Sequence, residues 1–386
     1  MKKKIAILGS TGSIGSSLLN IISRDIKNYK ILLLTAHKNY ESLIRQAQLF
    51  KVRNIIITDN NSYKRAKSKY KNRKINIFNN FENFKKIFPK KIDYVMSAIV
   101  GLDGLTPTYK IIKFTKKIAI ANKETIICGW NLIKNQLKKY NTVFVPVDSE
   151  HFSIWYALNN NSNLIKKIYL TASGGSLLNV PFNKIKNINL KKILKHPNWK
   201  MGKKITIDSS TMMNKVFEVI EAKKIFELEY EQIKIIIHPQ SYVHAILQFN
   251  DGMIKIIAHD TTMKIPIFNT LKFNDDKLLK LKKIDFKKLN NLNFQNVNKH
   301  KFPSIKLLKL LPKKNSLYET VIVSCNDELV KKYLKKTIKY NQINSIMSKM
   351  VNRDEFKKYK KMVPSKISDV INLSDYVRNK INTLYQ

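Results

Sequence analysis

The stretch KIAILGSTGSIGSSLLNIIS at residues 4–23 decides the fold class. Residues 4–8 have the length and apolar composition of a buried strand, and SSLLNIIS at 16–23 has the apolar spacing of a helix. GSTGSIG lies between them. A strand, a glycine turn and a helix are typical of a dinucleotide site, because glycine lets the backbone approach a pyrophosphate at the helix N-terminus. The spacing varies from the commoner G-x-G-x-x-G, and a plain strand-to-helix turn is the alternative.

The alternation of strands and helices continues after this turn, which predicts a doubly wound, Rossmann-type parallel sheet over residues 1–147. Lys38 follows the second strand, where an NAD site usually has an acid for the ribose. A lysine there favours NADP(H), although a surface lysine in a lysine-rich chain is the alternative. The apolar runs that predict further strands are KILLLTA (30–36), NIIIT (54–58), DYVMSAI (93–99) and KIAIAN (117–122).

Three acids between residues 148 and 218 suggest a metal site. Asp148 and Glu150 follow the apolar run TVFVPV, and alternate residues of a strand share a face, so we expect two carboxylates in one space. Such a pair needs a shared proton or a cation. Glu218 lies on a helix that we expect to begin near residues 208–211. Three oxygen ligands suit Mg²⁺ or Mn²⁺, whereas a strand-end pair with a solvated glutamate is the alternative.

A phosphate site is predicted beside these acids. Hydroxyls at residues 209–211 can cap a helix, and the bare N–H groups of a helix start bind anions, which Asn214 and Lys215 would reinforce. Ser173 is followed by two glycines, which permit close backbone approach to a ligand. An ordinary helix cap and an ordinary glycine turn are the alternatives.

The composition bounds the class of protein. The chain has 386 residues, 44% of them hydrophobic, which is enough for two or three domains. The 72 Lys and Arg against 27 Asp and Glu give a formal net charge of +45, which would raise nucleic-acid binding as a hypothesis. The lysines are dispersed and no RNA-binding signature accompanies them, so we expect no nucleic-acid partner. A basic field should still attract phosphorylated substrates.

The compartment is predicted from cysteine usage and hydropathy. Cys128 and Cys325 form no disulfide framework or metal knuckle, which favours the reducing cytoplasm. Gly9 ends the first apolar run too early for a signal peptide. Because no stretch approaches the roughly 18 apolar residues of a membrane span, we expect no membrane partner.

Seven motifs occur in a fixed order along the chain: GSTGSIG, ANKE (121–124), PVDSEH (146–151), SGG (173–175), HPNWKMG (196–202), DSSTMMNK (208–215) with Glu218, and IHPQSYVHA (237–245). In order and spacing they resemble those of the 1-deoxy-D-xylulose 5-phosphate reductoisomerase family. The resemblance implies an NADPH- and metal-dependent enzyme of the non-mevalonate isoprenoid pathway, which rearranges that sugar phosphate and reduces it to 2-C-methyl-D-erythritol 4-phosphate.

The same resemblance implies roles for individual residues. As metal ligands it implies Asp148, Glu150 and Glu218, and as catalytic residues Lys123, Glu150, His196 and Glu218. His196 belongs to a mobile flap whose Trp199 would close over the substrate; without the resemblance, both read as packing residues of a loop. The implied substrate contacts are Lys123, Ser149, Glu150, Ser173, His196, Ser209, Asn214, Lys215 and Glu218. The implied NADPH contacts are Thr11, Gly12, Ser13, Ile14, Lys38, Asn39, Asn122, Glu124 and Gly202.

The expected organisation has three parts. A catalytic α+β domain at 148–270, with the flap at 196–202, follows the Rossmann domain, and a linker at 271–300 leads to a helical bundle at 301–386. Family likeness also implies a homodimer. Two other classes are the alternatives: a semialdehyde dehydrogenase, which needs a catalytic Cys-His pair that neither cysteine is well placed to supply, and a basic nucleic-acid-binding protein.

Overall fold

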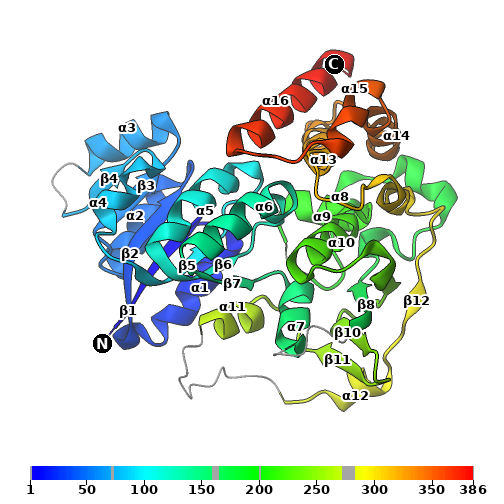
Figure 1. Ribbon diagram of the computed structural model, residues 1–386, viewed down its shortest axis with the longest axis horizontal. Coiled ribbons are helices and arrows are strands. Elements are labelled where there is room, and N and C mark those ends of the chain that lie inside the picture. Colours follow the sequence, from blue (N-terminus) through cyan, green and yellow to red (C-terminus); the bar gives the residue numbers. More distant parts are fainter. Residues whose placement is uncertain (1, 71–73, 159–164, 200, 272–282, 386) are drawn as a thin grey trace. The chain divides into compact units, whose positions relative to one another are not determined.

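The computed structural model describes residues 2–70, 74–158, 165–199, 201–271 and 283–385. The chain forms two compact units (Figure 1). The first takes its residues from the stretch before Ile126, from Leu132–Asp148 and from the segment that begins at Met263. The second takes the short stretch 126–131, then 149–262 and the C-terminal residues from 280 onward. The chain therefore passes from the first unit to the second after Asp148 and returns at Met263.

A parallel seven-stranded sheet forms the centre of the first unit, in the order β4-β3-β2-β1-β5-β6-β7. The chain runs outward from β1 to β4 and then returns to β5 on the other side of β1, so the strand order switches between β1 and β5. Ligands of such sheets bind beyond the carboxyl ends of the strands at this switch. The strands are β1 (Lys3–Leu8), β2 (Tyr29–Ala36), β3 (Asn54–Ile57), β4 (Asn76–Phe78), β5 (Ile92–Ser97), β6 (Thr115–Ile120) and β7 (Val143–Pro146).

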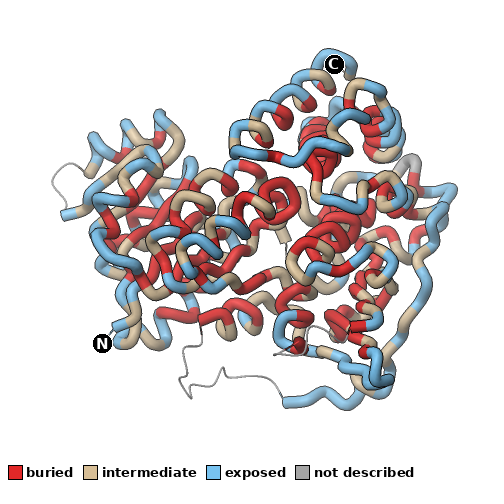
Figure 2. Tube along the Cα trace, in the orientation of Figure 1, coloured by how far each residue is buried: buried red, intermediate tan, exposed pale blue. Residues whose placement is uncertain are grey.

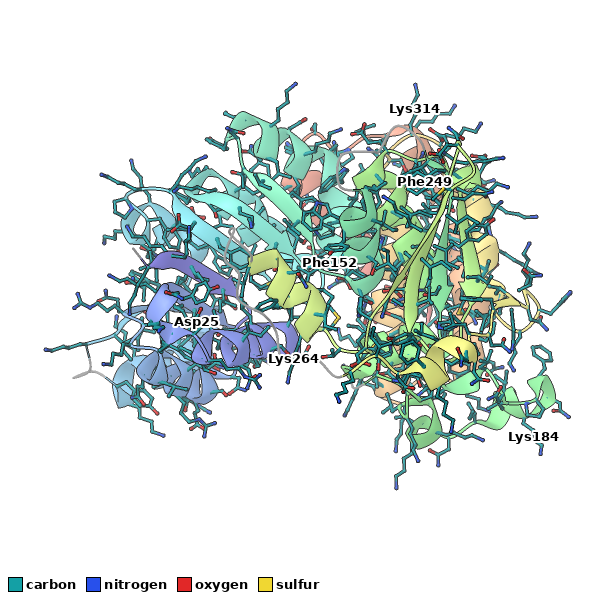
Figure 3. All side chains as sticks on the ribbon, turned by 90° about the horizontal axis from the view of Figure 1, so that it is seen from below. Asp25, Phe152, Lys184, Phe249, Lys264 and Lys314 are labelled. Atoms are coloured by element: carbon teal, nitrogen blue, oxygen red, sulfur yellow. The ribbon has the colours of Figure 1, made fainter. Side chains whose placement is uncertain are left out.

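Helices pack on this sheet through an aliphatic core. Ile5 and Ile7 of β1 lie in one buried cluster with Leu18 and Ile22 of α1, because alternate strand residues share a face and helical residues four apart share another. Ile267 of α11 joins the same cluster from far along the chain. Figure 2 shows the strands of the seven-stranded sheet as buried. Figure 3 labels Lys264, the first residue of α11. The helices are α1 (Ser13–Ser23), α2 (Tyr40–Leu49), α3 (Asn60–Lys69), α4 (Phe84–Ile87), α5 (Leu105–Ile111), α6 (Lys123–Lys139) and α11 (Lys264–Leu271).

The predicted Rossmann-type parallel sheet is confirmed. Each apolar run from residue 4 to 147 that was expected to be a strand coincides with one, to within a few residues at its ends. The pattern did not predict β4, because its three residues carry too few apolar positions for a period to show. It also did not place α11 with this sheet.

A mixed five-stranded sheet, ordered β11-β10-β8-β9-β12, forms the second unit together with α7 and α10. β8 and β9 are parallel, whereas the other neighbours are antiparallel. Leu170 and Leu247 of the sheet share a buried cluster with Ile154 of α7 and Val219 of α10. The elements are α7 (Ser149–Leu158), β8 (Ile165–Ala172), α8 (Leu190–Ile193), α9 (Lys203–Ser210), α10 (Met213–Phe226), β9 (Ile233–Ile237), β10 (Val243–Phe249), β11 (Ile254–Ala258), α12 (Phe286–Asn290) and β12 (Gln295–Asn296).

The helical C-terminal region is confirmed, with α13 (Tyr318–Leu334), α14 (Tyr340–Val351), α15 (Asp354–Lys357) and α16 (Ile367–Leu384). Residues 303–310, expected to be helical from their apolar spacing, form a 3-10 helix. Within the expected linker at 271–300, residues 272–282 lie outside the described part, and the rest includes α12 and β12, which pairs with β9. Among the helices that the structure describes, none is long and apolar enough to cross a membrane.

Candidate active site

The glycine turn after β1 requires glycine at two of its positions. Gly9 has φ of 82°, in the left-handed region, and a Cβ on it would lie 2.7 Å from the carbonyl oxygen of Ala98. A Cβ on Gly15 would lie 2.5 Å from the carbonyl oxygen of Gly9, so this glycine lets α1 approach the turn. A Cβ on Gly12, the N-cap of α1, would meet only the Gly9 oxygen, at 3.4 Å. The turn itself therefore does not require glycine at position 12. The missing side chain instead leaves the N-terminus of α1 accessible.

Two predicted cofactor residues cap helices at the carboxyl edge of this sheet. The Asn39 side chain accepts a hydrogen bond from Ser42 N at 3.3 Å and starts α2. The Asn122 Oδ1 accepts from Thr125 N at 2.8 Å and starts α6. Lys38, beside Asn39, is exposed at the end of β2. The other predicted cofactor residues of this unit are Thr11, Gly12, Ser13 and Ile14, in the turn and first residues of α1, and the buried Glu124 in the first turn of α6.

Lys123 and Asp148 meet at the same edge of the sheet. The Lys123 Nζ lies 3.1 Å from the Asp148 Oδ2, and their side chains are only 11% and 16% exposed. β6 and β7 are parallel neighbours, so residues that follow them reach one edge. The pair places an ammonium and a carboxylate together in the first unit.

In the second unit, the Lys215 ammonium lies between two carboxylates. Its Nζ is 2.7 Å from the Glu150 Oε1, also bonds the Glu218 carboxylate, and donates to the Thr171 carbonyl at 2.6 Å. Burial alone would lower the pKa of Lys215, but the carboxylates of Glu150 and Glu218 raise it above its ordinary value. The two carboxylates thus share one cation, which offsets half of their negative charge.

The same carboxylates fit a divalent ion. The Ser149 hydroxyl donates to the Glu150 Oε2, and the Asn214 amide donates to the Glu218 Oε1. Each of these bonds holds one oxygen of a carboxylate, while the other oxygen of the same carboxylate bonds the Lys215 ammonium. Hard divalent ions prefer carboxylate oxygens, so this donor set fits Mg²⁺ or Mn²⁺ in place of the ammonium.

The expectation that Asp148 and Glu150 alternate along a strand is wrong. β7 ends at Pro146, and α7 begins at Ser149, so Glu150 lies in the first turn of a helix. An aspartate and a serine directly after a strand are typical of a helix start, and this signal outweighed the alternation. Asp148 consequently pairs with Lys123 in the first unit, whereas Glu150, two residues later, belongs to the second.

The helix expected to begin near residues 208–211 begins instead at Met213. Residues 208–210 end α9, and Met212, with φ of 63°, separates the two helices. The Ser210 hydroxyl donates back to the Ile207 carbonyl at 2.7 Å, a bond that satisfies the end of a helix rather than its start. The prediction that the serines cap this helix is therefore wrong, whereas the Thr211 hydroxyl accepts from the Met213 N–H at 3.3 Å, at the start of α10.

The turn after β8 packs against these serines. Gly174 and Gly175 have φ of 79° and 66°, in the left-handed region that favours glycine. A Cβ on Gly175 would lie 2.7 Å from the Ser209 carbonyl oxygen, so a larger residue would push the turn away from α9. The glycines thus bring the Ser173 turn beside Ser209, which places two of the predicted substrate residues on adjoining segments.

His196 links the segment 196–199 to this turn. Its Nδ1 accepts from the backbone N–H groups of Asn198 and Trp199, at 3.1 and 3.0 Å. The proton is therefore on Nε2, which donates to the Ser173 hydroxyl oxygen at 3.0 Å. Burial lowers the pKa of His196 to about 4, so the ring is neutral near pH 7.

The rest of the predicted flap is held by the loop before β10. The Asn198 amide donates to the Pro239 carbonyl at 2.6 Å and to the Ser241 hydroxyl at 2.9 Å. The Trp199 ring lies edge-on to His244, with centroids 6.0 Å apart. Lys200 lies outside the described residues. Gly202, predicted as a cofactor contact, is the N-cap of α9 in the second unit.

Comparison with known proteins identifies the family. Residues 5–129 match the family profile described as 1-deoxy-D-xylulose 5-phosphate reductoisomerase, and residues 144–226 and 260–380 match the two C-terminal domain profiles of the same enzyme. A protein of that name from Pelagibacter ubique (strain HTCC1062) is 60% identical over 385 residues, which are 99% of each chain. This chain belongs to the 1-deoxy-D-xylulose 5-phosphate reductoisomerase family.

Further members of the reductoisomerase family agree over the whole length. The reductoisomerase of Wolbachia pipientis wMel is 36% identical and covers 97% of this chain and 95% of its own. A crystal structure of the reductoisomerase with NADPH, fosmidomycin and magnesium has a TM-score of 0.90 at 29% identity, covering 99% and 98% of the two chains. The Zymomonas mobilis enzyme with NADPH has a TM-score of 0.87 at 28% identity and covers 100% of both chains.

Sequence reasoning did not single out several residues that contact the candidate site. The His151 Nε2 donates to the Glu218 backbone carbonyl, 2.9 Å away, and its Nδ1 lies 3.5 Å from the Glu221 carboxylate. The Thr171 carbonyl accepts from Lys215, a backbone role that no side-chain pattern reveals. The motif PVDSEH contained His151, so its position beside Glu150 was the available signal.

Proposed function

We propose that this chain converts 1-deoxy-D-xylulose 5-phosphate to 2-C-methyl-D-erythritol 4-phosphate, by rearrangement and NADPH-dependent reduction with a divalent metal. The enzyme serves the non-mevalonate route to isoprenoid precursors. The observation that carries the proposal is the pair of Glu150 and Glu218 sharing one cation, in a chain of this family.

Asp148, Glu150 and Glu218 hold the divalent ion in this proposal. Glu150 and Glu218 already converge on one positive charge, and Asp148 is separated from Glu150 by Ser149 alone. The ion supplies Lewis-acid stabilisation of negative oxygen while a carbon–carbon bond breaks and reforms. Lys123, an ammonium with little exposure, stabilises the same developing charge.

The substrate's phosphate binds near Ser173 and α9. The Ser173 oxygen accepts hydrogen bonds from His196 and from Gly175 N, so its own hydroxyl proton is directed elsewhere and can donate to a phosphate oxygen. His196 therefore acts by orienting a donor, and its neutral ring avoids a competing charge. The full set of proposed substrate contacts is Lys123, Ser149, Glu150, Ser173, His196, Ser209, Asn214, Lys215 and Glu218.

The first unit would hold NADPH, with the N–H groups at the start of α1 available to its pyrophosphate and the exposed Lys38 to its ribose phosphate. The cofactor supplies the hydride that reduces the rearranged aldehyde. The proposed contacts are Thr11, Gly12, Ser13, Ile14, Lys38, Asn39, Asn122 and Glu124, together with Gly202. The segment 196–202 closes over the bound substrate and excludes water from the aldehyde. The working enzyme is a homodimer in the cytoplasm.

A semialdehyde dehydrogenase is disfavoured by the cysteines. Such an enzyme needs an accessible thiolate beside a base, whereas both Cys128 and Cys325 are buried. Burial also raises the pKa of the Cys325 thiol, which disfavours the nucleophilic form.

The direct test mixes purified protein with the deoxyxylulose phosphate, NADPH and Mg²⁺ and follows cofactor oxidation. The expected result is turnover that is lost on removal of the metal. A matched variant, Glu218→Gln, should lose turnover but retain NADPH affinity, because the cofactor contacts lie mainly in the other unit. An absence of turnover by the natural chain, with metal and cofactor bound, would refute the proposal.

A further inference from the structure

His259, at the end of β11, has one ring nitrogen in use and one without a partner. Its Nδ1 lies 2.9 Å from the Asp260 carbonyl oxygen. A carbonyl can only accept, so the ring proton is on Nδ1 and Nε2 presents a lone pair. That Nε2 is buried and has no hydrogen-bond partner among the described residues. Burial lowers the pKa of His259, which keeps the ring neutral near pH 7.

The ring lies among residues of the proposed substrate site. It stacks on the His244 ring, with centroids 3.7 Å apart and planes 13° from parallel. His244 in turn contacts Trp199 of the flap and donates through Nε2 to the His259 carbonyl at 3.1 Å. The negative charge of Glu150 also acts on the His259 ring. The ring is thus linked through His244 to Trp199 of the flap, and it lies within electrostatic reach of the Glu150 carboxylate.

A second histidine, His238, also has one bonded and one unpartnered nitrogen, but its surroundings differ. Its ring stacks on Phe294, 4.8 Å away, and its Nδ1 lies 2.8 Å from the Asn293 carbonyl oxygen. Burial lowers the pKa of His238 and the Asn293 carbonyl opposes that shift, whereas the Glu150 carboxylate also acts on the His259 ring. Of these two histidines, His259 is therefore the one within electrostatic reach of a proposed substrate residue.

We propose that His259 Nε2 accepts a hydrogen bond from a hydroxyl group of the sugar phosphate and thereby positions its carbon chain. A buried acceptor without a partner costs free energy, and a ligand hydroxyl removes that cost. The phosphate end is excluded, because a lone pair faces phosphate oxygens unfavourably and an ionised phosphate offers no proton. This assignment rests on the proposed function, and it makes His259 a substrate-binding residue in addition to those that the motifs implied.

The test compares His259→Phe, which keeps an aromatic ring to stack on His244 but removes the acceptor, with His259→Gln, whose amide carbonyl can replace it. For His259→Phe we expect the KM for the deoxyxylulose phosphate to rise about fivefold, the loss of one hydrogen bond, with the KM for NADPH unchanged. For His259→Gln we expect a KM within about twofold of the natural chain. The same change at the exposed His300, His300→Phe, is the matched control.

Inorganic phosphate, used as a competitive inhibitor, tests binding of the phosphate end of the substrate separately from binding of its carbon chain. Its inhibition constant should be the same in His259→Phe and the natural chain, because phosphate has no contact with this ring. An unchanged KM in His259→Phe, or a weakening of phosphate and NADPH equal to that of substrate, would overturn the assignment. If the phenylalanine variant does not fold, His259→Leu makes the same comparison. A natural chain without turnover would instead refute the proposed function.

Discussion

At the scale of single residues, Lys215 connects the stability of the site to its metal chemistry. Its side chain is 5% exposed and its ammonium lies between Glu150 and Glu218, so it offsets part of their negative charge when no divalent ion is bound. A divalent ion at the same carboxylates would compete with it for their oxygens. Metal binding would then release the ammonium toward the phosphate, for which the family resemblance implies a contact with this lysine.

Replacing Lys215 with methionine should destabilise the metal-free protein by about 3 kcal/mol, because two buried carboxylates lose their cation. Saturating Mg²⁺ should recover more stability in the variant than in the natural chain, since the ion no longer competes with an ammonium. Thermal unfolding with and without Mg²⁺ measures both effects. Lys166→Met, at an exposed lysine of β8, is the control and should change neither value. Equal stabilisation of both proteins by Mg²⁺ would contradict the competition.

His196 should make stability depend on pH in a defined window. Its pKa is about 4 in the folded chain and 6.5 ordinarily, so between these values the unfolded chain binds a proton that the folded chain does not. The free energy of unfolding therefore falls as the pH drops below 6.5, until about pH 4. His196→Asn keeps an acceptor for the flap N–H groups but does not titrate, so its stability should fall less steeply. Denaturant unfolding at several pH values measures the slopes, and equal slopes would exclude His196 as the cause.

At the scale of elements, the C-terminal helices hold α9, the helix that ends in Ser209. The Asp208 carboxylate is 2% exposed, accepts from the Asn326 amide of α13 at 2.8 Å and pairs with Lys204 at 3.1 Å. Lys204 also pairs with Asp327 of α13, at 3.0 Å. The helical region therefore has a role in the site, although its own sequence shows no chemistry.

Asp208→Asn should raise the KM for the sugar phosphate several-fold, because α9 loses a buried charge pair and Ser209 follows directly in the chain. The KM for NADPH should stay within about twofold. The lost interactions are those of α9 in the second unit, whereas the proposed cofactor contacts lie mainly in the first. Steady-state kinetics with each substrate varied separately gives both values. Asp375→Asn, at an exposed position of α16, is the control. Equal changes in both KM values would indicate general loosening instead.

The sequence predicted these elements better than it predicted their boundaries. Apolar periods placed the parallel strands and the C-terminal helices, because burial on a sheet or helix face leaves a repeating signature. The break at Met212 has no such signature: a hydroxyl-rich run reads equally as the start or the end of a helix. The motifs also suggested Glu150 and Glu218 as partners, but not that Lys215 would lie between them, since a lysine three residues before an acid usually forms a surface pair.

His259 illustrates what a pattern of residue types omits. In the sequence it reads only as the end of a strand, within MIKIIAHD at 253–260. Its significance depends on which nitrogen carries the proton and on the ring that stacks upon it, both of which follow from three-dimensional contacts. Side-chain orientation of this kind becomes visible only once β10 and β11 are paired.

At the scale of the whole molecule, the formal net charge of +45 should accelerate the capture of a phosphorylated substrate. Figure 3 shows nitrogen-tipped side chains around both units rather than on one patch, which suits general attraction of anions more than a nucleic-acid groove. Salt screens such a field over about 10 Å at 0.1 M, so the attraction depends on ionic strength while buried contacts such as Lys215–Glu150 do not.

Raising KCl from about 0.02 M to about 0.3 M should therefore lower kcat/KM for the sugar phosphate by about threefold or more, with kcat nearly constant. Stopped-flow or initial-rate measurements at limiting substrate give the ratio. Sucrose at matched viscosity is the control for slower diffusion, and it should reproduce only a small part of the effect. If kcat/KM is independent of salt, the positive charge plays no part in substrate capture. If kcat falls in parallel, salt acts on the site itself, for instance on the Lys123–Asp148 pair.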